Sequence, residues 1–191
     1  MKNRDSKINA SFDLELVIGE LQRTLSLVDA QQILSAASRI QVAKRIFTVG
    51  AGRSGLALKM VAMRLMHLGL TVHVAGEVTT PAIASGDLLL VASGSGTTWS
   101  VLHAAEVAHG VGAEILAITT APASKLGTLA ANLIVIPAAT KQEQGNTLSQ
   151  QYAGALFEQA MLLTMDALFH ILWQERGESA DVLWKRHANL E

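Results

Sequence analysis

Short apolar runs alternate with helix-like segments through the middle of this 191-residue chain. The runs are apolar at nearly every position, as in parallel strands that are buried on both faces of a sheet. They cover residues 45–49, 71–75, 88–92, 114–119 and 133–137. Helical patterns lie between them at 54–68, 98–109 and 124–131. This alternation predicts an α/β fold with a doubly wound, five-stranded parallel sheet flanked by helices.

Further helical segments flank the alternation on both sides. Apolar residues recur at helical spacing before it, and a polar stretch at 138–151 precedes a long, mostly apolar helix at 152–176. At 191 residues the chain has room for one sizeable core. We therefore expect a single domain over 1–191, with N-terminal helices at 12–42, a sheet core at 44–137, and a C-terminal helix and tail at 152–191.

The composition excludes several classes of partner. The net charge is −1 and no cluster of Lys or Arg stands out, so we expect neither nucleic acid nor a membrane surface as a partner. There is no cysteine, which excludes disulfides and a thiolate nucleophile. No signal-peptide pattern opens the chain, and the most apolar stretch, 160–173, is short for a membrane span. We expect a cytoplasmic protein, and its 50% hydrophobic content predicts association of several copies.

The first expected strand ends in VGAGRSG at 49–55, which fits the dinucleotide pattern G-x-G-x-x-G. Glu77 follows at the distance where a ribose-binding acid would stand. Against a dinucleotide site, the chain is short for a second, substrate-binding domain. Moreover, Arg53 and Ser54 place a cation and a hydroxyl in the turn, where a dinucleotide site needs cleared space.

A second glycine turn, ASGSGTT, follows the third strand and precedes another helix. Small hydroxyl residues and glycines at a helix N-terminus offer convergent N–H and O–H donors to an anion. The turn has no P-loop lysine, so we expect it to hold one phosphate together with Ser54. The alternative is that these hydroxyls only cap the helix. The candidate substrate-binding residues of this turn are Ser93, Gly94, Ser95, Gly96, Thr97 and Thr98.

The two turns, GRSG and SGSGTT, resemble those of the sugar isomerase (SIS) domain. Finer features are similar to the 6-phospho-3-hexuloisomerase family within it: MRLMHLG at 63–69, GEVTTP at 76–81, GALFEQ at 154–159 and RHANLE at 186–191. The resemblance implies strand order 2-1-3-4-5, a homotetramer with active sites between subunits, and no metal or organic cofactor. It also implies interconversion of D-arabino-3-hexulose 6-phosphate and D-fructose 6-phosphate through an enediol, in formaldehyde fixation by the ribulose monophosphate pathway.

Such a reaction needs a base that takes a proton from C2 and returns one to C3. Glu158 is the best candidate, because it lies among apolar residues in ALFEQAMLL and Glu is rarely buried without a purpose or a partner. Partial desolvation would strengthen it as a base. The resemblance also assigns it as the proton acceptor. The alternative is an exposed or salt-bridged helix residue.

Three further residues have open roles. His187 could open the furanose ring or shuttle a hydroxyl proton, or be an ordinary tail residue. Arg53 could pair with the phosphate or the substrate carbonyl, or form a salt bridge across a subunit interface. Glu77 is either a supporting carboxylate of the site or a turn residue. Met60 and Met63 belong to a spaced row that predicts core or interface packing.

Three classes of function follow from these residues. The favoured one is a sugar-phosphate isomerase acting on a small-molecule sugar phosphate, with related SIS aldose–ketose isomerases as the nearest alternative. The second is a non-catalytic regulator that binds a sugar phosphate and has no need of Glu158. The third is an NAD-dependent oxidoreductase.

Overall fold

A computed structural model describes residues 10–139 and 149–190 of the chain. Part of the predicted polar stretch, 140–148, lies outside the described residues. The elements in chain order are α1 (Ala10–Ser26), α2 (Ala30–Val42), β1 (Ile46–Gly50), α3 (Gly52–His67), β2 (Val72–Val74), β3 (Leu88–Ala92), α4 (Trp99–Gly110), β4 (Glu114–Thr119), α5 (Lys125–Leu129), β5 (Asn132–Val135), α6 (Ala155–Arg176) and α7 (Ala180–Trp184).

The five strands form one parallel sheet in the order β2-β1-β3-β4-β5, which confirms the predicted fold class. Strand β1 lies next to the edge strand and pairs with β2 on one side and the central strand β3 on the other. The chain places β2 on one side of β1 and then crosses over to place β3 on the other side, so the order in which strands are added reverses at this point. In open α/β sheets, ligands bind at the carboxyl ends of the strands at such a reversal.

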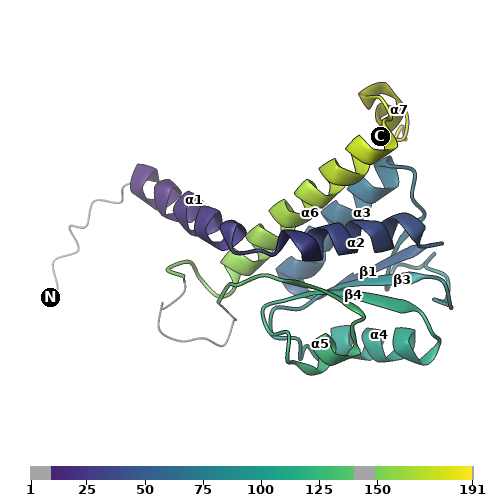
Figure 1. The fold of residues 1–191 in the computed structure, drawn as a ribbon, viewed down its shortest axis with the longest axis horizontal. Coiled ribbons are helices and arrows are strands. Elements are labelled where there is room, and N and C mark those ends of the chain that lie inside the picture. The colour runs from purple at the N-terminus through teal and green to yellow at the C-terminus, as the bar shows by residue number, and fades with distance from the viewer. Residues whose placement is uncertain (1–9, 140–148, 191) are drawn as a thin grey trace, which may run out of the picture.

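Helices cover both faces of the sheet, which explains why its strands are apolar at nearly every position (Figure 1). On one face α2, α3 and α6 pack over a core that includes Leu90, Leu116 and Met161. On the other face α4 and α5 cover a smaller cluster around Val91 and Ala117. Adjacent residues of β3 therefore enter opposite cores.

Two helices near the ends of the chain pack on the rim of this three-layer body, with Leu21 of α1 and Leu183 of α7 in contact with its main core. Helix α1 extends outward from it, and α7 lies beyond the end of α6 (Figure 1). By length and composition α6 could cross a membrane, but half of its most apolar window is buried inside the protein. Length and composition alone do not separate such a helix from one that packs in a protein core.

Helix α7 is the one element that the sequence analysis missed. It has five residues, too few for a periodic pattern to be recognised, and unlike the equally short α5 it does not lie between two predicted strands. Leu183 anchors it, being 7% exposed. Elsewhere the predicted elements lie within a few residues of those observed, and the boundaries of β3 and β4 match.

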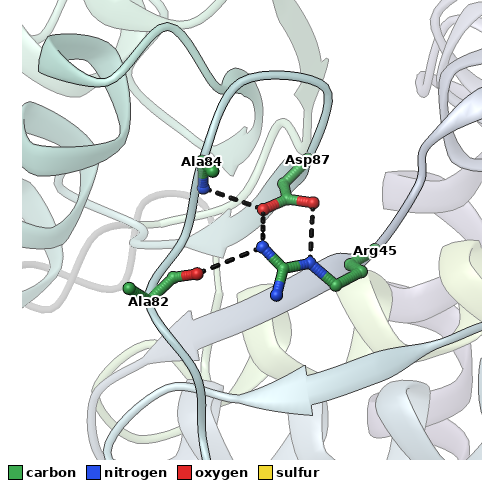
Figure 2. Close-up of polar contacts among 4 residues, drawn as sticks. All are labelled: Arg45, Ala82, Ala84 and Asp87. Carbon is green, nitrogen blue, oxygen red and sulfur yellow. Dashed lines mark hydrogen bonds and ion pairs between the residues drawn. The ribbon is translucent and has the colours of Figure 1, made fainter.

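A partly buried ion pair, with the carboxylate of Asp87 enclosed and Arg45 more exposed, fixes the start of the sheet at the edge opposite the candidate site. Arg45 Nε donates to Asp87 Oδ1 at 2.9 Å, and its guanidinium also donates to the carbonyl of Ala82 (Figure 2). The N–H of Ala84 donates to the same carboxylate at 2.8 Å. These bonds hold the pKa of Asp87 below its usual value, with the Arg45 hydrogen bond as the main cause and burial opposing it. The turn before β3 is thereby tied to β1.

Candidate active site

A cavity of about 270 Å³ opens at the carboxyl ends of β1 and β3, where the sheet reverses direction. Both glycine turns contribute to its wall, as does the beginning of α6. No carboxylate or imidazole is among the described residues that line it. The lining residues are Ala51, Gly52, Ser54, Ala92, Ser93, Gly94, Ser95, Thr98, Ala139, Gly154 and Phe157.

Three helices begin at this cavity. Their N-cap residues, Ala51 of α3, Thr98 of α4 and Gly154 of α6, all line it. None of the three caps its helix with a side-chain hydrogen bond within the described residues. The first N–H groups of a helix and the positive end of its dipole favour anions. Three such ends around one cavity are therefore well suited to bind a phosphate.

The loop after β3 is held in shape by its own hydroxyls. Ser93 Oγ lies 3.0 Å from Thr98 Oγ1 and accepts a hydrogen bond from the N–H of Gly96 at 3.2 Å. Gly96 has φ of +64°, and a Cβ there would overlap the side chain of Ser124. Only glycine fits both requirements. Ser95 also lines the cavity, so three of the four predicted hydroxyl donors, Ser93, Ser95 and Thr98, come from this one loop.

The turn after β1 supplies the fourth hydroxyl, Ser54, which is 4% exposed and lines the cavity. Its glycines have a packing role, since a Cβ on Gly55 would lie 2.5 Å from the carbonyl oxygen of Gly50. Close approach of α3 to β1 therefore accounts for the G-x-G-x-x-G spacing without a dinucleotide. The two predicted turns do converge on one cavity.

Glu158 and Arg53 form an ion pair beside this cavity. Arg53 Nε donates to Glu158 Oε2 at 2.6 Å, joining the turn after β1 to the first turn of α6. The Glu158 side chain is 3% exposed, whereas that of Arg53 is 64% exposed. Neither lines the cavity, but Phe157 does, and so do Gly52 and Ser54 on either side of Arg53.

This pair bears on the alternatives that the sequence left open for both residues. Glu158 is buried, so it is not an exposed helix residue, and it is salt-bridged to a residue of the GRSG turn. Arg53 pairs within its own chain, with a partner that the sequence analysis did not consider. The pair places a carboxylate and a cation at the edge of a cavity rich in hydrogen-bond donors that suit an anion.

Glu20 on α1 is a supporting residue that sequence reasoning missed. It is 3% exposed and accepts hydrogen bonds from Ser149 Oγ and the N–H of Gln150, each at 2.7 Å, and from Gln151 Nε2 at 3.0 Å. Burial opposes ionisation of Glu20, but these bonds bring its pKa below the usual value. They fix the segment that leads into α6. The helical pattern of α1 carried no signal of this contact, because its partners are about 130 residues away.

Besides Gly96, which packs on Ser124, and the Arg53–Glu158 pair, three predicted site residues do not line the cavity of their own chain. Thr97 is exposed and bonds Ser95, with its Oγ1 3.0 Å from Ser95 Oγ. Glu77 forms an exposed ion pair with Lys59 at 2.7 Å and lines a separate, more open cavity beside β2. The Lys59 hydrogen bond lowers the pKa of Glu77.

His187 is the third such residue. Its ring stacks on that of His67, at the C-terminal end of α3, with 3.9 Å between ring centres. Helix α3 begins at the cavity and has 16 residues, which at about 1.5 Å each span roughly 24 Å. His187 therefore cannot act on a ligand in the cavity of its own chain from this position.

No group of three His, Asp or Glu side chains in the described ranges, 10–139 and 149–190, is placed to hold a metal ion. Among the described residues, hydroxyls and helix N-termini line the cavity, and the Arg53–Glu158 pair lies beside it.

Comparison with known proteins relates this site to a family. The SIS domain family matches residues 39–163. A 3-hexulose-6-phosphate isomerase of Mycobacterium gastri is 54% identical over 94% of this chain and 90% of its own length. One of Bacillus subtilis is 39% identical over 92% and 95%. A crystal structure from Methanococcus jannaschii, for which 3-hexulose-6-phosphate isomerase function was inferred, is 30% identical, covers 94% of this chain and 99% of its own, and has a TM-score of 0.80.

Proposed function

The chain belongs to the SIS domain family, and we propose that it is an isomerase interconverting D-arabino-3-hexulose 6-phosphate and D-fructose 6-phosphate. The two named relatives, similar over nine-tenths or more of the chain, support the substrate. The observation that carries the proposal is the cavity itself, where phosphate donors and a buried carboxylate meet at one end of the sheet.

The substrate phosphate binds in the cavity, between the hydroxyls of Ser54, Ser93, Ser95 and Thr98. A hydrogen bond to a charged phosphate oxygen contributes about 1.5–3 kcal/mol, so a few such donors suffice for micromolar binding. Gly94 lines the cavity, Gly96 allows the loop to pack on Ser124, and Thr97 donates hydrogen bonds to Ser95 Oγ from its N–H and its hydroxyl. The dephosphorylated sugar would leave all of these donors without their charged partner.

The chemical step is a proton transfer between neighbouring carbons. Glu158 removes the C2 proton of the 3-ketose, the C2–H electron pair forms the C2=C3 double bond of a cis-enediol, and the C3 carbonyl oxygen takes up a proton to become a hydroxyl. A proton then returns to C3 while the C2 hydroxyl gives up its proton and becomes a carbonyl, which gives the 2-ketose with the number of protons unchanged. No electrons leave the substrate, so the reaction needs no redox partner.

Arg53 contributes to this step through its charge. Its hydrogen bond from Nε to Oε2, at 2.6 Å, holds the Glu158 carboxylate in place beside the cavity. Its exposed side chain is free of the packing that fixes Glu158, so it can also follow the negative charge that develops on the enediol oxygens. We assign Arg53 to the substrate-binding site in this dual role.

The complete site needs more than one copy of the chain. Helix α3 carries an exposed apolar row, Leu56, Met60 and Met63, and Leu14 and Ile18 on α1 are exposed as well. We propose that other copies cover these residues in a cytoplasmic homotetramer. In that assembly a neighbouring copy brings its His187 to the cavity, and Glu77 supports the site from an adjoining surface.

Incubation of the purified protein with enzymatically generated D-arabino-3-hexulose 6-phosphate tests the proposal. Fructose 6-phosphate should accumulate to equilibrium, and the dephosphorylated hexulose should be a very poor substrate. Equal turnover of both sugars would exclude the phosphate site. Tight sugar-phosphate binding without turnover would instead identify a regulator, and a change in NADH fluorescence on addition of the protein would favour the oxidoreductase.

A further inference from the structure

Two sequence motifs that the cavity does not use meet at the far end of α3. MRLMHLG at 63–69 ends this helix, and RHANLE begins at residue 186, more than a hundred residues later. His67, from the first motif, is 3% exposed. The ring of His187, from the second, stacks on it at 3.9 Å with an interplanar angle of 22°. The exposed histidine thus lies flat on a buried one.

Hydrogen bonds of Arg186 fix the C-terminal tail beside the stacked rings of His67 and His187. Arg186 Nη1 donates to the carbonyl of His67 at 2.9 Å and to Glu178 Oε2 at 2.6 Å. A Cβ on Gly69 would lie 3.0 Å from the Arg186 guanidinium carbon, so this glycine leaves room for the arginine. On its other side His187 contacts Trp184, with ring centres 4.6 Å apart.

The surroundings of the two rings are predominantly cationic. Arg64 comes from α3, Arg176 from the end of α6, and Arg186 from the tail, while Glu178 is engaged by Arg186. Burial, and then the charges of His187 and Arg64, lower the pKa of His67. His67 is therefore neutral near pH 7. A neutral, buried imidazole can stack with a second imidazole whether or not the second ring is charged, whereas a charged ring would repel a charged neighbour.

We propose that His67 is a positioning residue that holds the His187 imidazole in the orientation needed for its work on the sugar phosphate. This inference rests on the proposed function, in which His187 serves the cavity of a neighbouring copy. Stacking restricts rotation of the His187 ring, and a fixed ring transfers a proton faster than a mobile one. His67 itself, buried under His187, does not touch the substrate.

The test compares His67→Leu, which removes the ring, with His67→Phe, which keeps a flat apolar ring. We expect His67→Leu to lower kcat about tenfold with KM unchanged, and His67→Phe to stay within about twofold of the wild type. In a His187→Ala background His67→Leu should cause no further loss. His109→Leu, at an exposed site on α4, is the matched control and should be silent.

Two measurements separate positioning from a general structural role. The proton resonances of the His187 ring should lose part of their upfield shift in His67→Leu and keep it in His67→Phe. Thermal unfolding confirms that each variant is folded. Three results would overturn this inference while leaving the proposed function intact. They are a wild-type kcat in His67→Leu, an equal loss of kcat when His67→Leu is made in the His187→Ala background, and a loss in His67→Phe as large as in His67→Leu. A wild-type protein that does not interconvert the ketose phosphates would overturn the proposed function as well.

Discussion

Replacement of Glu158 by Gln tests most directly whether this residue is the catalytic base. Gln has nearly the same size and can still accept the hydrogen bond from Arg53 Nε, so the fold should survive. It cannot act as a carboxylate base, and the described residues that line the cavity include no carboxylate or imidazole that could replace it. Turnover should fall by roughly 10² to 10⁴, the usual contribution of general base catalysis, or about 2.7–5.4 kcal/mol of barrier.

The assay follows fructose 6-phosphate formation through coupled reduction of NADP⁺ at saturating substrate. KM should change little, because the phosphate donors lie on the turns after β1 and β3 and Glu158 lies on α6. Glu175→Gln, at an exposed position of the same helix, is the matched control and should retain wild-type turnover. If Glu158→Gln binds substrate and keeps near-normal turnover, the base lies elsewhere, and His187 is the next residue to test.

Three other predictions concern binding, stability and assembly. Ser95→Ala should raise KM for the sugar phosphate roughly tenfold to a hundredfold, since one donor to a charged group is lost, whereas Ser100→Ala on the exposed side of α4 should leave KM unchanged. Arg45→Met should lower Tm by several degrees at pH 7, and Lys125→Met, in an exposed pair, by far less. Because the pKa of Asp87 is lowered in the folded state, the ionised carboxylate stabilises the fold above pH 3.8, and this stabilisation should be lost in the wild type as the pH falls through the lowered pKa. Equal Tm losses for the two variants would contradict a special role for this pair. Light scattering at micromolar concentration should give the mass of a tetramer, and a monomer would argue against a site shared between copies.

Much of the fold was predictable because its signals are local. Residues 88–92 and 114–119 are apolar at nearly every position, and the strands observed there have the predicted boundaries. The two glycine turns could be placed together because the carboxyl ends of parallel strands lie at one edge of a sheet. Their hydroxyls do line one cavity.

The parts that were missed depend on contacts between distant segments. No local pattern around Arg53 predicts its ion pair with Glu158, and none around Glu20 predicts its hydrogen bonds to residues 149–151. The convergence of α6 with α3 and α4 on the cavity also required the three-dimensional arrangement. His187 shows the same limit, since its position is defined by a stack on a helix end far away in the sequence.

The central claim is that the cavity isomerises a sugar phosphate by moving a proton between C2 and C3 through an enediol. Turnover of D-arabino-3-hexulose 6-phosphate in deuterated water, followed by NMR of the product, tests it most directly. A carboxylate base beside an open cavity can exchange its proton with solvent, so fructose 6-phosphate should carry deuterium at C3, at least in part. Product formed by the wild-type protein with only protium at C3 would contradict the claim, because a direct hydride shift would then explain the reaction.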